Sequence, residues 1–337
     1  MNKATDSLVS STLEDSAYYQ AVFEVNKVKH AVLLFSFAII IFIGLIGNGF
    51  CIYAQLKMYR SEGLTPSSLC IFCLTLFNFL SVLIGATNHW FTEVIPFSIR
   101  NYATWACKTH FFFTRLLTET SIWFQVIYSL MRVIAVTWPH KTHLILSMKI
   151  TKIVLILAIF LVTLSDFPRA LANNIVQYPW GVRCLIADRN LAYIFTVFHF
   201  FTVLVIPDLI LFFTTILVGY QMAIAIKAKS SLIHSHISTS AVKEMLAEES
   251  ARGSTRYMFL NNFTLIILYA PYLVYKVYEA YSRPYLRSFS YEEASFYDFI
   301  YRLANIPLFL YHAIYWSFLL TGSKYRNAFL NNLRCLQ

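Results

Sequence analysis

The sequence predicts an all-α membrane protein, a bundle of seven spanning helices, on two observations. Only 13% of the 337 residues are charged, against about 25% in a soluble globular chain, and 58% are hydrophobic. The apolar residues also fall into runs of about 20, which is the length that an α-helix needs to cross roughly 30 Å of hydrocarbon. The expected spans are 31–56, 66–88, 104–131, 150–168, 194–226, 256–280 and 295–320.

The composition argues against most other classes of protein. Gly and Pro number 9 each and Cys numbers 6, which excludes collagen-like, low-complexity and disulfide-scaffold chains. The basic residues form no cluster, so a nucleic-acid partner is not expected despite the net charge of +10. No nucleophile with a base and no metal-ligand spacing fits the spans. Neither an enzyme, a metal nor a cofactor is therefore expected.

The expected spans differ in their length and in how many ionisable residues they contain. The first is the clearest, because 31–56 contains no charged residue. The third, fifth and seventh contain ionisable residues and are longer than a perpendicular crossing needs, so we expect them to tilt. The fourth is expected to end at Pro168. Residues 1–30 are polar and have no signal-peptide pattern, so they are expected to form a tail before the 31–320 membrane domain, with 321–337 as a second tail.

The charge distribution predicts the orientation. When each charge is assigned to the nearer side, the whole net charge of +10 falls on one side. That side holds the segments after the first, third and fifth spans and the C-terminal tail. Under the positive-inside rule it is cytoplasmic. The N-terminus is then expected to be extracellular.

Marker residues in the spans carry a family resemblance. The third span has Cys107 at its outer end and Arg132 25 residues later, followed by Pro139. The other spans supply weaker marks in the same order, which are Asn48, Asn78, Pro207, Pro271 and the Thr321–Arg326 segment. This pattern resembles the rhodopsin-like (class A) G-protein-coupled receptors from about residue 40 to the end. The aromatic-rich outer surface looks most like that of invertebrate neuropeptide receptors.

The resemblance implies a plasma-membrane receptor with an extracellular peptide ligand, the lipid bilayer and a heterotrimeric G protein as its partners. It implies a short amphipathic eighth helix in 321–337 and a disulfide between Cys107 and Cys184. G-protein coupling would involve Arg132, Pro139, Lys141, Lys227 and Arg256. Helix kinks and activation would involve Asn48, Asn78, Pro207 and Pro271, and Cys335 would be lipidated.

Several residues depart from the family pattern. Asn78 stands where most members have an Asp that helps to bind sodium, which argues against a sodium site. Met131 replaces the acid before Arg132, so the arginine lacks its usual partner, and whether signalling needs a ligand at all is left open. Tyr269 replaces the usual Trp of the sixth helix.

Two charged pairs are candidate ligand contacts. Arg115 with Glu119, and Asp298 with Arg302, are each one helical turn apart, so the members can pair and offset part of each other's desolvation. For Arg115 and Glu119 a self-satisfied structural pair is the alternative, although charges inside a membrane are functional candidates by default. Asp208 either hydrogen-bonds within its helix or reaches the pocket. The expected ligand-binding residues are Arg115, Glu119, Trp180, Asp208, Tyr269, Tyr278, Asp298 and Arg302.

Two other functions remain open at this stage. A chemosensory receptor of the same fold would bind a small molecule. A transporter or channel would predict repeats or broken helix pairs near the middle of the membrane, and the sequence has neither. The oligomeric state is left open.

Overall fold

The computed structural model describes residues 2–95, 98–178, 181–230, 239–282, 285 and 288–334. Within this part of the chain nearly every element is a helix, and the two strands form one antiparallel hairpin. The elements are α1 (Asn2–Glu62), α2 (Pro66–Ser81), η1 (Val82–Ala86), α3 (Thr87–Val94), α4 (Ile99–Tyr102), α5 (Thr104–Thr137), η2 (Pro139–Lys141), α6 (Thr142–Ile145), α7 (Met148–Ala172), β1 (Asn173–Tyr178), β2 (Gly181–Ile186), α8 (Arg189–His199), η3 (Phe200–Val205), α9 (Ile206–Ser230), α10 (Thr239–Ser282), α11 (Tyr291–Leu319) and α12 (Ser323–Arg334).

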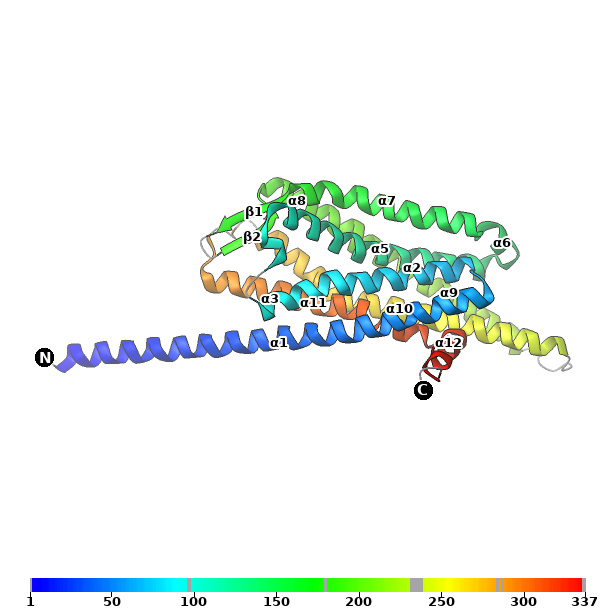
Figure 1. Ribbon diagram of the computed structural model, residues 1–337, viewed down its shortest axis with the longest axis horizontal. Helices are drawn as coiled ribbons and strands as arrows, with labels where there is room; N and C mark the ends of the chain where they lie inside the picture. The colour runs from blue at the N-terminus through cyan, green and yellow to red at the C-terminus, as the bar shows by residue number, and fades with distance from the viewer. Residues whose placement is uncertain are drawn as a thin grey trace.

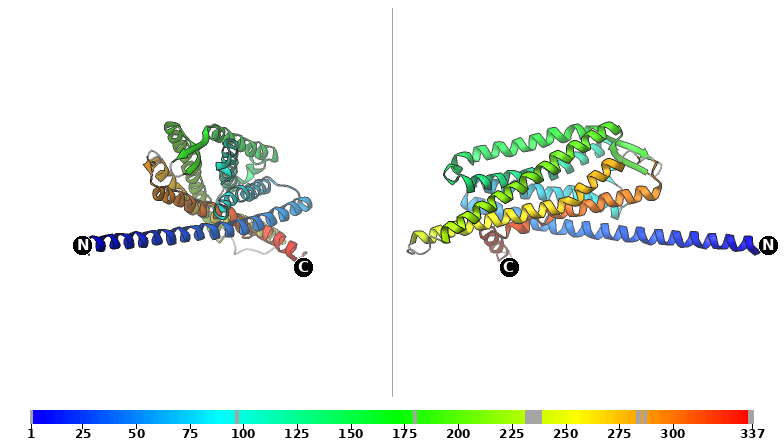
Figure 2. Two further views of the ribbon diagram at one scale, coloured as in Figure 1. Left: turned by 60° about the vertical axis from the view of Figure 1, so that its left-hand side comes forward. Right: turned by 180° about the vertical axis from the view of Figure 1, so that it is seen from behind.

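The long helices lie side by side along one axis (Figure 1). In this bundle α5 packs against α2, α7 and α9, while α11 packs between α1 and α10. The β1–β2 hairpin lies at the end past which α1 projects, and we call this the hairpin end. The opposite end, with α6 and α12, is the far end, and α10 extends past the other helices there (Figures 1 and 2).

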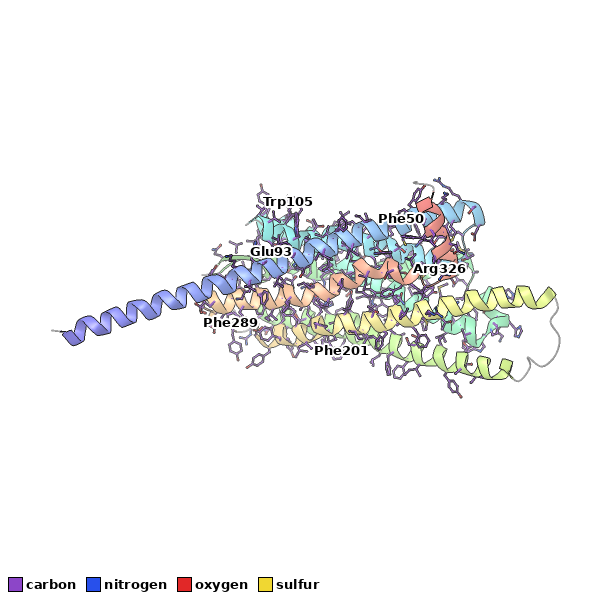
Figure 3. The ribbon with its side chains drawn as sticks, turned by 90° about the horizontal axis from the view of Figure 1, so that it is seen from below. Phe50, Glu93, Trp105, Phe201, Phe289 and Arg326 are labelled. Atoms are coloured by element: carbon purple, nitrogen blue, oxygen red, sulfur yellow. A yellow bond between two sulfur atoms is a disulfide. The ribbon has the colours of Figure 1, made fainter. Side chains whose placement is uncertain are left out.

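Six helical segments are long and apolar enough to cross a membrane. They are Asn26–Glu62, Pro66–Val94, Thr104–Thr137, Met148–Ala172, Arg189–Gln221 and Thr255–Ser282. Large apolar side chains on these segments are exposed, among them Phe42 and Phe213, each more than half exposed, and Phe201, which is half exposed and labelled in Figure 3. Apolar surface on this scale needs a lipid or protein partner. The chain therefore has the fold of a helical membrane protein.

A seventh long helix, α11, is more polar than these six. It has 29 residues, which is enough to cross a bilayer, yet its sequence does not reach the apolar level of the other segments. It is nevertheless packed into the bundle, with Phe309, Tyr311 and Tyr315 almost completely buried. The expected seventh span thus corresponds to a helix that is packed into the bundle, with Glu292 and Glu293 exposed at its start.

Local sequence signals explain where several helices begin. Thr65 caps α2, because its hydroxyl accepts from the Ser68 N–H while the Ser68 hydroxyl accepts from the Thr65 N–H at 2.8 Å. Ser290 and Glu293 form the same capping box at the start of α11. In α7 the cap is Ser147, whose hydroxyl accepts from Ile150 N–H.

Two expected helix boundaries are wrong. The fourth helix does not end at Pro168, because α7 continues to Ala172 and keeps Asp166 and Arg169 helical. A proline bends a helix by removing one backbone hydrogen bond, and tight neighbours can hold the turns on both sides of it. The fifth span also starts earlier than expected, because α8 begins at Arg189. The second and fifth helices are interrupted by the π-helical turns η1 and η3. The expected tail, residues 1–30, is helical from Asn2 and continuous with the first span.

Close packing fixes α1, α11 and α12 together toward the far end. Gly47 lies against Trp316, and a Cβ at this glycine would be 2.0 Å from the indole Nε1. The Trp316 ring stacks on Phe329 of α12 with 6.0 Å between centroids, and Phe329 also meets Phe50 edge-on at 4.6 Å. The missing side chain of Gly47 therefore makes room for the ring that holds α12 in place.

A candidate ligand cavity at the hairpin end

A cavity of about 220 Å³ opens inside the bundle at the hairpin end. Its lining comes from α3, α4, α5, α7, α8, η3, α10 and α11, from both strands, and from Ser98 just before α4. Most of the charged lining residues are basic, namely Arg100, Arg115, Arg169, Arg183, Lys276 and Arg302, and three are acidic, namely Glu119, Glu279 and Asp298. Such a cavity can hold a small polar ligand or one part of a larger one.

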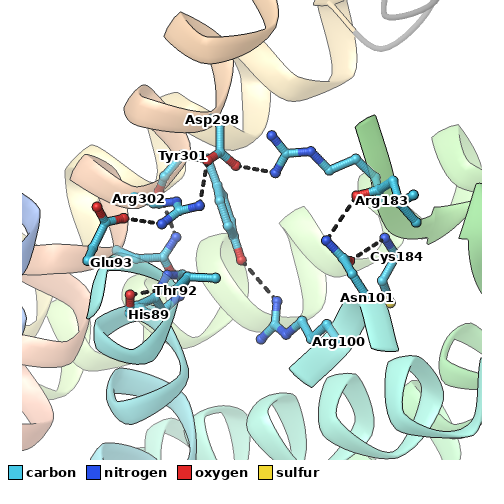
Figure 4. A network of polar contacts seen from close by, with 12 residues as sticks. His89, Thr92, Glu93, Arg100, Asn101, Arg183, Cys184, Asp298, Tyr301 and Arg302 are labelled. Carbon is cyan, nitrogen blue, oxygen red and sulfur yellow. Dashed lines mark hydrogen bonds and ion pairs between the residues drawn. The ribbon is translucent and has the colours of Figure 1, made fainter. Parts of the chain in front are cut away.

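The hairpin that covers the cavity is tied to α5. A disulfide joins Cys107, at the start of α5, to Cys184 in β2, as predicted. Asn101 adds two hydrogen bonds, because its side chain donates to the Val182 carbonyl at 2.9 Å and accepts from the Cys184 N–H at 3.1 Å (Figure 4). The position of β2 over the cavity is thus set by one covalent bond and two polar contacts.

An ionic network links the elements around the cavity mouth (Figure 4). Arg302 of α11 pairs with Asp298 at 2.7 Å, as its spacing predicted, and also with Glu93 of α3. Asp298 in turn accepts from Arg183 of β2 at 2.5 Å. Arg100 donates instead to neutral partners, the His110 ring at 2.9 Å and the Tyr301 hydroxyl at 3.3 Å. The network ties α3, α11 and the hairpin together.

A second group of charges lies deeper and is almost completely buried. Arg115 pairs with Glu119 one turn away, which confirms that predicted pair. Its Nε also donates to Asp166 Oδ1 of α7 at 3.1 Å. All three residues are less than 10% exposed, so each charge depends on the others to offset its desolvation. The three charges lock α5 to α7.

Further charged residues line the cavity at the same depth, and with Arg115, Glu119 and Asp166 they form what we call the deep wall. Lys276 of α10 pairs with Glu279 at 2.6 Å and lies over the Tyr272 ring at 5.1 Å. His199 of α8 has its Nδ1 3.5 Å from Glu119 Oε1. Arg169 of α7, only 4% exposed, completes the set and lines the same cavity.

Only some of the expected ligand-binding residues line the cavity. Five line the cavity, namely Arg115, Glu119, Tyr269, Asp298 and Arg302. Tyr278 lies beside it, with its ring against Tyr275 and Tyr297. Asp208 is half-buried on α9 and is not part of the lining. Trp180 lies outside the described residues.

Several residues of the deep wall are absent from the sequence prediction. Asp166 and Arg169 were treated as the end of a span because Pro168 was expected to stop the helix. Their spacing of three residues inside an apolar run was the available signal, since charges within a membrane helix are functional candidates. His199 and Lys276 carried the same signal in the fifth and sixth spans.

A chain of neutral polar groups leads from the cavity floor into the bundle. The Tyr269 hydroxyl lies 2.8 Å from His312 Nε2, and His312 Nδ1 lies 2.5 Å from Asn78 Oδ1. The same Asn78 oxygen accepts from the Ser121 hydroxyl at 2.6 Å, and Asn48 donates to the His312 carbonyl at 2.9 Å. Because the Asn78 oxygen is an acceptor, the imidazole donates from Nδ1 and accepts from Tyr269. This chain connects α10, α11, α2, α5 and α1.

The residues expected to contact a G protein lie at the far end where they are described. Arg132 of α5 is half-buried and donates to the Thr255 hydroxyl of α10 at 3.4 Å. Pro139, Lys141 and Arg256 are exposed. The side chain of Lys227, and Cys335 as a whole, lie outside the described part. Pro207 falls at the start of α9, directly after η3, and Pro271 lies within α10.

No family model matches the chain, and no curated protein is significantly similar to it. In the described part of the chain, no three His, Cys, Asp or Glu side chains are grouped so as to hold a metal ion. The features that bear on function are therefore the cavity and the Tyr269–His312–Asn78 hydrogen bonds beneath it.

Proposed function

We infer that the chain is a G-protein-coupled receptor that resembles the rhodopsin-like family and takes a peptide ligand. The hairpin end would face the outside of the plasma membrane, and the far end, with α12 as the short eighth helix, would face the cytoplasm. Ligand binding in the cavity would shift the equilibrium between two arrangements of the helices.

One observation carries this proposal. A charged cavity lies inside an apolar helical bundle, and the covering hairpin is held by the Cys107–Cys184 disulfide. Buried charges in a membrane helix are costly, and they persist where they serve a ligand or each other. An oxidised cystine is typical of an extracellular or luminal surface. Both features support an outward-facing recognition site.

The contacts below the cavity support transmission of the signal. Tyr269 is part of the lining and is joined through His312 to Asn78 and Ser121 in the middle of the bundle. A ligand that displaces the Tyr269 ring would alter these hydrogen bonds. At the far end, the Arg132 contact with Thr255 joins α5 to α10, so separation of these helices would break it. Two discrete arrangements of such contacts are what a receptor switch requires.

The test is second-messenger output, both cyclic AMP and calcium, in cells that express the chain and are exposed to a peptide library. We expect a peptide response in the wild type that is lost in Arg132→Ala and reduced in Tyr269→Phe, which keeps the ring but removes its hydrogen bond. Surface expression is held equal, and Arg60→Ala, an exposed arginine near the end of α1, is the control. A peptide response that survives in Arg132→Ala would contradict coupling through this residue.

The size of the cavity favours one alternative, a receptor for a small molecule. Drug-sized ligands occupy about 300 to 1,000 Å³, and 220 Å³ would hold a smaller compound or only one or two side chains of a peptide. The same assay with small soluble metabolites and odorants separates the two. Responses to these compounds and to no peptide would replace the peptide by a small ligand within the same proposal.

A further inference from the structure

The deep wall of the cavity contains one cation that is poorly compensated. Arg115 has two carboxylate partners and Lys276 has one. Arg169, in contrast, has no carboxylate oxygen within 4 Å among the residues that the structure describes. Its contacts are a hydrogen bond to the Phe195 carbonyl at 3.4 Å and the face of the Phe111 ring at 5.5 Å.

The surroundings of Arg169 leave part of its guanidinium available. The side chain is buried, with 4% of the residue exposed, and its Nε makes no hydrogen bond in the described part of the structure. The Oδ1 of Asp166, the acid one turn earlier, accepts from Arg115 Nε. Arg115 also shares the Phe111 ring, at 5.4 Å, so a second positive charge faces the same aromatic surface.

A buried arginine in this setting is suited to an oxyanion. The guanidinium presents several N–H donors in one plane, which match the two oxygens of a carboxylate or of a sulfate or phosphate group. His199 lines the same cavity one turn after Phe195 on α8; its Nδ1 lies 3.5 Å from Glu119 Oε1, and its Nε2 makes no hydrogen bond in the described residues. An anion at Arg169 could therefore receive a second donor from α8.

We propose that Arg169 forms the oxyanion subsite of the cavity, so that the ligand carries a negatively charged oxygen group at its buried end. This deepens the proposed function, because it names the chemistry of the ligand for that same cavity. It also reassigns the role expected for Arg115 and Arg302. Both are paired with carboxylates within the protein, whereas Arg169 is the deep cation left for the ligand; Arg100, which also has neutral partners, lies at the mouth.

The test uses the purified full-length chain in detergent micelles and requires no signalling. The probe is N-acetylphenylalanine, compared with its neutral amide, because the two differ only in the carboxylate and the ring suits a wall that includes Tyr272 and Tyr275. Thermal unfolding is followed at constant ionic strength over a range of probe concentrations. We expect a saturable rise in the unfolding temperature with the acid and a much smaller one with the amide.

Variants then assign the effect to one residue. Arg169→Gln should weaken acid binding about 30-fold or more, as expected when a buried charge pair loses one partner. Arg169→Lys keeps the charge without the planar fork and should retain part of the selectivity. The control is Arg60→Gln, which should bind the acid as the wild type does. If Arg169→Gln does not fold, the wild-type comparison of acid with amide and the Arg169→Lys variant still decide.

The absence of an acid-selective rise in the wild type overturns the proposal, and so does unchanged acid binding in Arg169→Gln. The first result is expected if Arg169 turns instead to Asp166 Oδ2, which makes no hydrogen bond in the described structure. The outcome is separate from that of the signalling assay. If the chain gives no second-messenger response but binds the acid selectively, the receptor proposal is refuted and the subsite proposal stands. If it responds to a peptide but binds acid and amide equally, the subsite proposal is refuted and the receptor proposal stands.

Discussion

The buried polar groups at the hairpin end differ in charge from those in the middle of the bundle. At the hairpin end there are buried ions that face a cavity. In the middle there are neutral amide, hydroxyl and imidazole groups in direct contact, as in the Tyr269, His312, Asn78 and Ser121 chain. Ions next to a cavity can interact with a ligand, whereas the neutral groups bond mainly to one another, with Asn78 Nδ2 and Asn48 Oδ1 left without a hydrogen bond in the described structure. Under the proposed function, this difference would separate ligand recognition from transmission of the signal.

The largest expected effect on unfolding free energy comes from the disulfide that holds the hairpin over the cavity. Replacing Cys107 and Cys184 together by Ser removes the constraint on a 77-residue separation, which is worth about 4 to 5 kcal/mol of unfolding free energy in the chain-entropy model. Chemical unfolding in detergent micelles measures it. The control is Cys73→Ser, a free half-buried cysteine of α2. Equal losses in the two proteins would show that the hairpin does not depend on its covalent bond.

Removing Arg115, a cation of the deep wall, should lower the unfolding free energy almost as much as removing the disulfide. Arg115→Met leaves Glu119 and Asp166 buried without their shared partner, and we expect a loss of about 3 to 5 kcal/mol in unfolding free energy. Arg183→Met at the mouth, whose side chain is 32% exposed, should lose less than about 1 kcal/mol. A loss at Arg115 no greater than at Arg183 would break the distinction between deep wall and mouth.

The neutral chain is expected to show strong coupling between its members. His312→Phe leaves the Tyr269 hydroxyl without its partner and removes one of the two donors to Asn78 Oδ1, so we expect a loss of about 1 to 3 kcal/mol in unfolding free energy. Adding Asn78→Leu should cost less than the sum of the two single losses, because both members of one contact are then removed. A double-mutant cycle measures this. Additive losses would indicate that the two side chains do not interact.

The smallest expected effect comes from close packing toward the far end. Gly47→Ala forces Trp316 to move and should cost about 1 to 3 kcal/mol. Gly49→Ala is the matched control on the same helix, because its Cβ would lie 3.6 Å from Phe79, an ordinary contact. This control should be neutral or slightly stabilising, since Ala favours a helix more than Gly does. A neutral Gly47→Ala would show that Trp316 is free to shift.

The sequence predicted contacts that are local in the chain. The Arg115–Glu119 and Asp298–Arg302 pairs follow from a spacing of four residues, which places both side chains on one face of a helix. The disulfide followed from a family resemblance rather than from geometry. The apolar runs indicated a helical membrane protein, because burial in lipid leaves a clear signal in composition.

The contacts between helices could not be predicted in the same way. Asp166 meets Arg115, and Glu93 meets Arg302, only because of how each helix is rotated about its axis. That rotation is set by the packing of many side chains at once. Hydropathy gives no information about it when a helix is apolar on nearly every side. The position of Asp208 away from the cavity has the same origin.

The two π-helical turns affect how this chain must be aligned with others. In η1 the Thr87 N–H donates to the carbonyl of Val82, five residues back, so the turn holds one residue more than an α-helical turn. The turn in η3, over Phe200–Val205, is of the same kind. A relative with regular helices at these two places would match this chain only with a one-residue gap in each. An ungapped alignment would assign the wrong side chain to every position between the turn and the next loop.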